Sequence, residues 1–278
     1  FGTESRHEGG AYDTYTARDE QGRKWKAMND SSLIPQKKVN GNITDASSFY
    51  RTEVVSPILS YEDIPKLQEL VRMLRKAGAF ANKSCGIHIH VGAERFTAKT
   101  LRNLVNIMAS KEEMISRALQ INPSRESRYC RKTNSTFLKD LNRKKPDTLD
   151  GIANLWYQEA PYGRNNHYNS TRYHGLNLHA TFTKGTIEFR LFQFADPADG
   201  KRNGLHAGEM KAYIQLCLAM SQLAKMVRTA SPKPQQTDND KYAMRCWMLR
   251  LGFIGEEFAT AREILLRNME GNAAWRNK

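Results

Sequence analysis

Two histidines on one predicted strand are the side chains whose spacing first points to chemistry. Residues 85–91 read CGIHIHV, and alternate residues of a strand face opposite sides of a sheet. His88 and His90 then share one face, roughly 6–7 Å apart, and the isoleucines and the valine share the other. Two imidazoles at this spacing can share a metal ion or contact a phosphate. An incidental pair of packed histidines is the alternative, and the pattern favours a functional site.

A second segment repeats this arrangement with charged side chains. Residues 186–192 read TIEFRLF, and the alternation places Glu188 and Arg190 on one face of a predicted strand. A cross-strand ion pair would give them a purely structural role. Alternatively, Glu188 holds a divalent metal and Arg190 contacts a phosphoryl oxygen, because a planar guanidinium matches the geometry of a phosphate. The histidine strand favours this second interpretation.

Two further glutamates suggest a metal site. Glu4 and Glu53 also lie on predicted strands. With Glu188 and the two histidines, they could converge on one sheet face. Hard divalent cations such as Mg²⁺ prefer carboxylate oxygens and keep positions open for phosphate. Taken singly, each glutamate would be an ordinary surface or edge charge, so the metal prediction depends on their convergence.

The composition is typical of a globular protein with a basic excess. The 278 residues, 40% of them hydrophobic, suffice for one large domain or two small ones. No apolar run approaches a membrane span, no signal peptide is visible, and the four cysteines form no C-x-x-C pair. We therefore expect a cytoplasmic protein with reduced thiols and no membrane association. Because the chain begins with Phe1 rather than Met, a removed leader stays open as an alternative.

The net charge of +14 points to an anionic partner. Lysines and arginines are spread over most of the chain, and no nucleic-acid-binding motif accompanies them. A nucleotide substrate explains part of the charge, and an acidic polymer or partner could explain more. A basic nucleic-acid-binding protein without catalysis therefore remains a less favoured alternative.

Helical and strand patterns follow one another without strict βαβ alternation. Amphipathic spacing predicts helices over 62–76, 97–122, 206–228, 241–251 and 255–269. Strands are predicted over 1–4, 25–30, 51–59, 85–91, 172–182 and 186–192. The last two are expected to form a hairpin around Lys184-Gly185. Because strands arrive as pairs, we expect an α+β fold with a curved, largely antiparallel sheet and helices packed on one face.

The remaining segments read as loops and linkers. Residues 9–24 suggest a hairpin or loop, and residues 35–48 are rich in Asn, Gly and Ser and suggest a loop. Residues 122–170 are polar, basic and irregular, which predicts a mobile lid or insertion. Residues 231–240 form a Pro/Gln/Asp linker. We therefore expect a catalytic domain over 1–230, this linker, and a helical extension over 241–278.

Seven short motifs follow one another along most of the chain. They are FGTE at 1–4, Trp25 with DSSL at 30–33, EVVSP at 53–57, CGIHIHV at 85–91, R-Y-x-x-L-N at 172–177, TIEFRLF at 186–192 and HAGEMKAY at 206–213. No single motif is decisive, but the seven in order are specific. The sequence resembles the amidoligase family, within the carboxylate–amine ligase superfamily that includes glutamine synthetase.

The resemblance implies a glutamine-synthetase-like catalytic domain that forms amide bonds with ATP. In that reaction ATP phosphorylates a carboxylate, and an amine then displaces the acyl phosphate. The implied cofactors are ATP and Mg²⁺, with Mn²⁺ as a substitute. The implied partners are a carboxylate and an amine, with peptides or proteins among the candidates, and a homo-oligomer is a possible assembly.

The resemblance also implies roles for individual residues. Arg190 would be catalytic and contact phosphate, and His90 would serve the nucleotide or the substrate. Arg172 would be catalytic and Asn177 would bind the cofactor, both as lining of the pocket. The implied metal ligands are Glu4, Glu53, His88 and Glu188.

Two departures and one further alternative accompany this interpretation. Members of the superfamily commonly carry a second carboxylate two residues after the first, where this chain has Arg6. Glu8 could substitute if the strand continues. Residues 195–203 resemble an insertion. A metal-dependent hydrolase could use the same histidines and glutamates, although it would usually need more histidine ligands.

Overall fold

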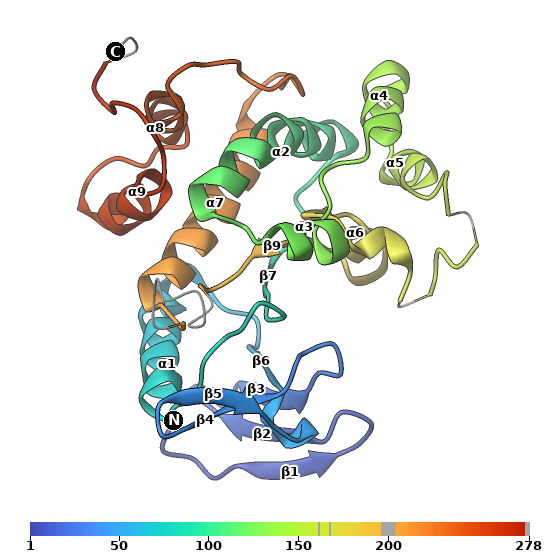
Figure 1. Ribbon diagram of the computed structural model, residues 1–278. Coiled ribbons are helices and arrows are strands. Elements are labelled where there is room, and N and C mark those ends of the chain that lie inside the picture. The colour runs from blue at the N-terminus through green and yellow to red at the C-terminus, as the bar shows by residue number, and fades with distance from the viewer. Residues whose placement is uncertain (161, 167, 196–203, 276–278) are drawn as a thin grey trace. The chain divides into compact units, whose positions relative to one another are not determined.

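The chain folds into two units that each combine antiparallel strands with helices. The computed structural model describes residues 1–160, 162–166, 168–195 and 204–275. The N-terminal unit comprises Phe1–Cys85 and Phe194–Ala207, and the C-terminal unit comprises Gly86–Gln193 and Gly208–Lys278. Both units contain strands and helices (Figure 1), so the predicted α+β class is confirmed. The described strands form sheets of four, two and three strands.

Four antiparallel strands form the larger sheet of the N-terminal unit, in the order β1-β2-β3-β6. They are β1 (Arg6–Gly9), β2 (Thr14–Arg18), β3 (Lys24–Asn29) and β6 (Thr52–Val55). The predicted strand over 25–30 is confirmed as β3. The strand predicted over 1–4 is wrong, because Gly2 has a φ of 68° and the first strand begins only at Arg6. The strand predicted over 51–59 ends at Val55, before Pro57 removes a ladder donor.

Arg23 connects the turn after β2 to the start of helix α1 (Ile64–Lys76). Its guanidinium donates to the two carboxylate oxygens of Asp63, at 2.7 and 2.8 Å, and to Asp19 Oδ2 at 2.9 Å. These bonds hold the pKa of Asp63 well below its usual range. Burial raises the pKa of Asp19, but hydrogen bonds from Trp25 and Arg23 outweigh it and bring the value to about 2. The ion cluster therefore joins the sheet to the helix that was predicted over 62–76.

Residues 35–48, predicted as a loop, form a β-hairpin. Strand β4 (Gln36–Val39) pairs with β5 (Asn42–Asp45) around Asn40-Gly41. Asn40 and Gly41 have φ values of 50° and 82°, and a two-residue hairpin turn of type I′ requires positive φ at both positions. The loop prediction is wrong because Asn and Gly, taken singly, indicate breaks in regular structure, whereas Asn-Gly together indicates a hairpin turn.

Strand β9 (Thr186–Phe192) is the central strand of the C-terminal unit, in the sheet order β7-β9-β8. Its neighbours are β7 (Ile87–Gly92) and β8 (Leu176–Asn177). Every residue of β9 after Thr186 is buried, and Phe189 and Phe192 are inaccessible to solvent. The strand that carries His88 and His90 and the strand that carries Glu188 and Arg190 therefore pair in one sheet.

The hairpin predicted over 172–192 is wrong in its first arm. Within the predicted first strand, 172–182, only Leu176–Asn177 pair with β9. Helix α6 (His179–Lys184) begins two residues later. Asn177 Oδ1 accepts a hydrogen bond from the backbone N–H of His179 at 2.9 Å, which starts the helix. Gly185, with a φ of 68°, ends it.

The described part of residues 122–170 contains three helices, so the predicted irregular segment is wrong. They are α3 (Pro123–Tyr129), α4 (Ser135–Lys144) and α5 (Leu149–Trp156). Asn122, Asn134 and Thr148 cap their N-termini through side-chain oxygens. The prediction is wrong because polar capping residues and short helices lower the apolar content of this segment, although the helical pattern is present. Whether this segment moves as a lid stays a prediction.

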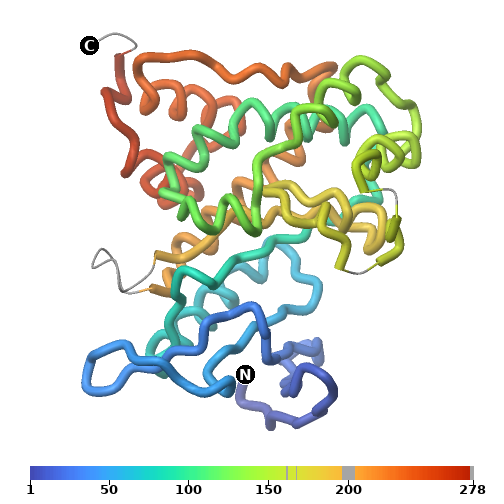
Figure 2. The backbone as a smooth tube through the Cα atoms, turned by 45° about the vertical axis from the view of Figure 1, so that its right-hand side comes forward, coloured from blue at the N-terminus to red at the C-terminus, as the bar shows by residue number. Residues whose placement is uncertain are grey.

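The long helices and the C-terminal helices agree with the sequence. They are α2 (Ala98–Leu119), α7 (Ala207–Met226), α8 (Asp240–Arg250) and α9 (Ala259–Leu266). Helix α9 packs against α2 (Figure 2), and Asn268 Nδ2 donates to the Ala118 carbonyl at 2.8 Å. The division into 1–230, a linker and an extension stays a prediction. The predicted insertion over 195–203 lies, apart from Ala195, outside the described residues.

Within the described ranges, no helix has both the length and the apolar character that crossing a bilayer requires.

Candidate functional site

Glu188 is the centre of a polar cluster on the sheet of the C-terminal unit. Its register partners on the flanking strands are Asn177 of β8 and His90 of β7. Arg190 Nη1 donates to Glu188 Oε1 at 2.8 Å, and Asn177 Nδ2 donates to Oε2 at 2.6 Å. The Glu188 side chain is only 5% exposed, so these two bonds compensate for the burial of its charge.

The two histidines approach the same carboxylate from β7. His88 Nδ1 lies 3.5 Å and His90 Nε2 lies 3.8 Å from Glu188 Oε1. His90 Nδ1 also lies 2.8 Å from Thr186 Oγ1, which fixes the orientation of the ring. The structure thus brings together the histidines of one motif and the Glu-Arg pair of another.

The electrostatics keep Glu188 ionised. Burial raises the pKa of this carboxyl group, but Arg190, the two histidines and the amide of Asn177 outweigh burial and leave the pKa below its usual value. Glu188 is therefore a carboxylate at neutral pH, with lone pairs on each oxygen beyond those already used.

Both histidines are neutral at pH 7. The surrounding protein removes water from the charged form of His88, and with the repulsion of Arg190 it lowers the pKa of that ring to about 3. Burial also lowers the pKa of His90, although Glu188 opposes the shift. Neutral imidazoles have a free lone pair, which a metal ion or a hydrogen-bond donor can use.

Arg190 and Arg172 are held by the aromatic ring of Tyr173. The Arg190 guanidinium carbon lies 5.7 Å from the ring centroid, and that of Arg172 lies 5.0 Å from it. Arg172 belongs to a 3₁₀ turn (Ser170–Arg172) and also lies 5.2 Å from the ring of Tyr168. Arg172 is thus connected to the cluster through Tyr173.

Arg125 of α3 is a member of the site that the sequence did not single out. Its buried guanidinium donates through Nη2 to the Arg190 carbonyl at 2.9 Å. Its charge also lowers the pKa of His88. A Cβ added at Gly86 would lie only 2.2 Å from Arg125 Nη2. Gly86, which directly precedes the histidine strand, is therefore the sequence feature that indicates a large side chain close to the backbone there.

Glu4 and Glu53 lie in the N-terminal unit. Glu4 is exposed and precedes β1, and Glu53 is an exposed residue of β6. Their convergence with His88 and Glu188 stays a prediction, as does the metal site. Within the described part of either unit, no group of three or more His, Cys, Asp and Glu side chains could by itself hold a metal ion.

Glu8, the suggested substitute for the carboxylate replaced by Arg6, lies on β1. Its Oε1 accepts from Lys24 Nζ at 2.7 Å and from Thr16 Oγ1 at 3.1 Å. The bond from Lys24 is the main cause of its lowered pKa. Glu8 is therefore committed to an ion pair within the N-terminal sheet.

The site consists of a buried carboxylate that is held by a guanidinium and an amide and faces two neutral imidazoles. It lies on an antiparallel sheet of an α+β protein. The model of a family described as "putative amidoligase enzyme" matches residues 1–221. The chain belongs to this family, which confirms the resemblance and supports a ligase-type function. No curated protein and no solved structure matches the chain.

Proposed function

We propose that this protein is an ATP-dependent carboxylate–amine ligase that forms amides through an acyl phosphate. The observation that carries the proposal is the buried Glu188–Arg190 pair with two neutral histidines facing it. Membership of the amidoligase family supplies the reaction class. Phosphoryl transfer to a carboxylate requires groups that offset repulsion between two anions, and Arg190 is suited to this role.

Arg190 has one nitrogen left for a phosphate. Nη1 donates to Glu188 and Nε donates to the Tyr129 carbonyl at 3.4 Å, while Nη2 makes no hydrogen bond to the rest of the described chain. Tyr173 supports the guanidinium from one face. A cation held in this way needs little reorganisation when charge develops on a transferred phosphoryl group.

The donor set of the cluster fits a hard divalent cation. Glu188 offers ionised oxygen and His88 offers a neutral nitrogen, and hard cations accept such ligands when further oxygens complete the shell. Glu4 and Glu53 would supply those oxygens. When bound, Mg²⁺ or Mn²⁺ would neutralise phosphate charge, and His90 and Asn177 would orient the nucleotide or the substrate.

The test supplies ATP, Mg²⁺, a panel of carboxylates and hydroxylamine as a small amine. We expect release of ADP and phosphate together with a hydroxamate. Glu188→Gln keeps the side-chain volume and should abolish turnover, and Arg190→Lys should reduce it strongly because a point charge cannot reproduce a guanidinium fork. Glu69→Gln, at an exposed position on α1, is the matched control and should leave turnover unchanged.

Hydrolysis of an amide or a phosphoester without ATP, dependent on Glu188 and Arg190, would overturn the ligase proposal in favour of a metal-dependent hydrolase. Tight, salt-sensitive binding of nucleic acid without any ATP binding would overturn it in favour of the non-catalytic alternative. Melting curves of each variant show whether a loss of turnover reflects loss of the fold.

A further inference from the structure

The guanidinium of Arg190 is held by one partner on its own strand and by two from outside it. Glu188, also on β9, accepts from Nη1 at 2.8 Å. The Tyr129 carbonyl, at the end of α3, accepts from Nε at the longer distance of 3.4 Å. The ring centroid of Tyr173 lies 5.7 Å from the guanidinium carbon. Because Glu188 belongs to the same strand and holds a single nitrogen, the outside contacts decide how the guanidinium is oriented.

The two outside contacts are also joined to each other. The rings of Tyr129 and Tyr173 meet edge to face, with centroids 6.2 Å apart, although Tyr129 ends α3 and Tyr173 directly follows the 3₁₀ turn. Edge-to-face packing is a preferred geometry of aromatic pairs. A rotation of the Tyr173 ring would therefore disturb its contacts with both Tyr129 and Arg190.

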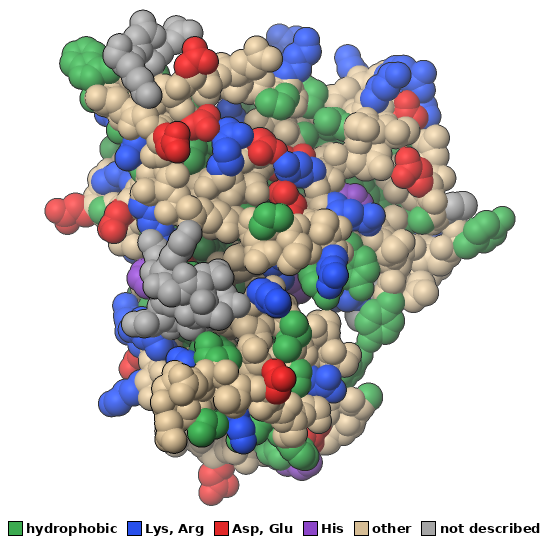
Figure 3. Space-filling view, viewed as in Figure 1, with side chains coloured by type: hydrophobic (Ala, Val, Ile, Leu, Met, Phe, Trp, Pro, Cys, Tyr) green, Lys and Arg blue, Asp and Glu red, His purple; other side chains and the backbone are tan. Residues whose placement is uncertain are grey.

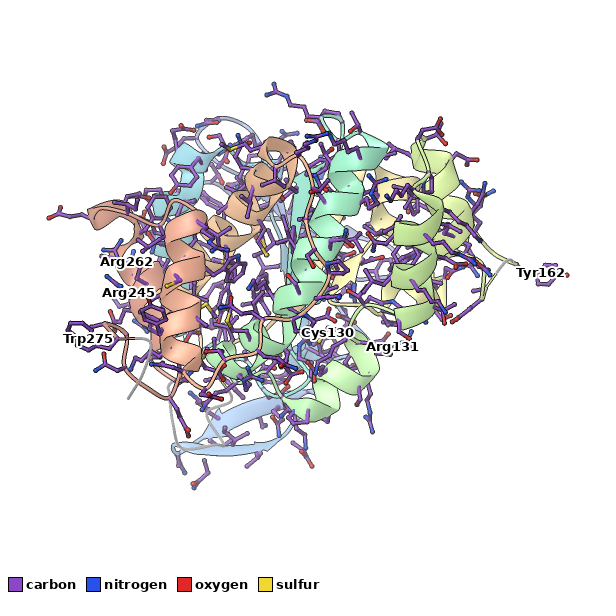
Figure 4. The ribbon with its side chains drawn as sticks, turned by 90° about the horizontal axis from the view of Figure 1, so that it is seen from above. Cys130, Arg131, Tyr162, Arg245, Arg262 and Trp275 are labelled. Atoms are coloured by element: carbon purple, nitrogen blue, oxygen red, sulfur yellow. The ribbon has the colours of Figure 1, made fainter. Side chains whose placement is uncertain are left out.

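Arg131, labelled in Figure 4, connects the segment of Tyr173 to the segment of Tyr129. It follows α3 and its side chain is exposed. Its backbone N–H and its Nε donate to the Tyr173 carbonyl at 3.1 and 3.2 Å, and its Nη2 donates to the Ser170 carbonyl at 3.2 Å. An exposed arginine with two side-chain bonds to main-chain carbonyls holds the turn before β8 in place.

The same connection continues into the backbone of β9. The Arg131 carbonyl accepts the N–H of Gly175 at 2.8 Å, and the Gly175 carbonyl accepts the N–H of Arg190 at 2.8 Å. Arg131 is therefore connected to Arg190 in two ways, through the backbone of Gly175 and through the ring of Tyr173.

We propose that Arg131 and Tyr173 are positioning residues that set the orientation of the Arg190 guanidinium. Arg131 fixes the turn, the turn fixes the Tyr173 ring, and the ring contacts the guanidinium. The Nη2 nitrogen, which Arg190 has left for a ligand, is then oriented before any ligand binds. That this ligand is a phosphoryl group rests on the proposed function, whereas the orientation itself does not.

Preorganisation of this kind matters because a misplacement of about 1 Å can cost about 100-fold in rate. The bond from Nε to the Tyr129 carbonyl is longer than the usual range of about 2.7–3.2 Å. We therefore expect the Tyr173 ring to provide more of the restraint than the Tyr129 carbonyl does.

The first experiment observes the Arg190 side chain by NMR of the full chain with isotope-labelled arginine. The Nε–H signal of Arg190 is assigned by its loss in Arg190→Lys. An aromatic ring shifts the signals of nearby protons, so Tyr173→Leu should move and broaden this signal. Tyr173→Phe keeps the ring and should leave the signal close to that of the wild type. The Arg131 bonds go to the backbone carbonyl of Tyr173, so both substitutions leave them in place.

Arg131→Met tests the other positioning residue and leaves the Tyr173 ring unchanged. It removes the side-chain donors to the Tyr173 and Ser170 carbonyls, so the Arg190 signal should move and broaden. Arg131→Lys should not restore it, because an ammonium group cannot reproduce two donors in a fixed fork. Arg128→Met is the matched control, since Arg128 is an exposed arginine of the preceding helix. This variant should leave the signal unchanged.

The second experiment measures turnover in the hydroxamate assay. Tyr173→Leu should lower kcat about tenfold, as the loss of a partly buried cation–π contact would. The KM for ATP should change less, because the orientation of Arg190 matters most in the transition state. In an Arg190→Lys background the same substitution should have little further effect, since the guanidinium that the ring positions is gone.

An Arg190 signal that stays unchanged in Tyr173→Leu and in Arg131→Met would overturn the proposal. Effects of Tyr173→Leu and Arg190→Lys that add in full would also overturn it, because they would indicate a structural role. If Arg131→Met does not fold, Tyr173→Leu decides. If the wild type forms no hydroxamate, the ligase proposal fails, and the NMR signal still decides whether Arg190 is positioned.

Discussion

At the scale of single residues, buried and clustered ionisable groups define the candidate site. Glu188 is held as a carboxylate by Arg190 and Asn177, while His88 and His90 are held neutral. All three groups have lowered pKa values and are deprotonated at neutral pH, and shifted pKa values so close together are typical of functional sites. Two ionisable groups outside the cluster, Glu112 and Asp63, give direct tests of how burial and ion pairs act in this fold.

Glu112 on α2 is the first of these groups. Burial raises its pKa to about 7, although Thr133 donates to it through the backbone N–H and the hydroxyl. Between about pH 4.5 and 7 the folded state binds the extra proton, so stability falls as the pH rises. Glu112→Gln should raise the melting temperature by a margin that grows from pH 5 to pH 8. Glu263→Gln, at an exposed position on α9, should show no such trend.

Asp63 tests the opposite case, in which a lowered pKa makes the stability of the fold rise with pH. Because Arg23 holds the pKa of Asp63 well below its usual range, the carboxylate stabilises the fold above the unfolded pKa of about 3.9. That stability is lost as the pH falls through the folded pKa. Asp63→Asn should lower the melting temperature by several degrees at pH 7, and the difference should shrink toward pH 2. Asp45→Asn, at an exposed position on β5, is the control, and an equal effect there would contradict this account.

At the scale of elements, Gly86, which directly precedes β7, helps to position the histidines of that strand. A side chain at Gly86 would collide with the Arg125 guanidinium, which supports β9 through the Arg190 carbonyl. We expect Gly86→Ala to lower the melting temperature and to reduce turnover. Gly92→Ala, at the other end of β7, would meet only the flexible end of Glu94 and should be milder. Thermal melts and the hydroxamate assay check both, and equal behaviour of the two variants would argue against a role for Arg125.

The elements also show what the sequence could predict. Alternation of apolar residues predicted β9 and the histidine strand, and their helical spacing predicted α1, α2 and α7. These predictions succeed because the apolar residues of each segment follow a single clear period. The hairpin of β4 and β5 was missed because its strands are short and polar, and only Asn40-Gly41 marked it. Helices α3 to α5 were missed because their caps are polar and each helix is short. Arg125 was missed because its bond to the Arg190 carbonyl joins segments distant in sequence.

At the scale of the whole molecule, the ligands named in the metal proposal come from both units. The implied ligands Glu4 and Glu53 lie in the N-terminal unit, and His88 and Glu188 lie in the C-terminal unit. The basic excess is spread widely: lysines and arginines are scattered over the face shown in Figure 3 rather than gathered in one patch. This distribution favours a local anionic ligand over a long polyanion.

ATP should raise the melting temperature only when Mg²⁺ or Mn²⁺ is present, because ligands that bind the native state stabilise it. Glu53→Gln should remove this shift as completely as Glu188→Gln does, although the two residues belong to different units. Excess chelator is the control. A shift that survives chelation, or that depends on Glu188 alone, would contradict a metal held by both units.

Strand β9 constrains how this protein can change over evolutionary time. Its odd-numbered residues, Ile187, Phe189 and Leu191, fill the core, and Glu188 and Arg190 lie between them on the opposite face. A strand repeats every two residues, so inserting or deleting one residue here would exchange the two faces along the rest of the strand. Point substitutions can alter one face at a time, but this stretch cannot change in length. A change of length here would therefore disturb the core and the Glu188–Arg190 pair together.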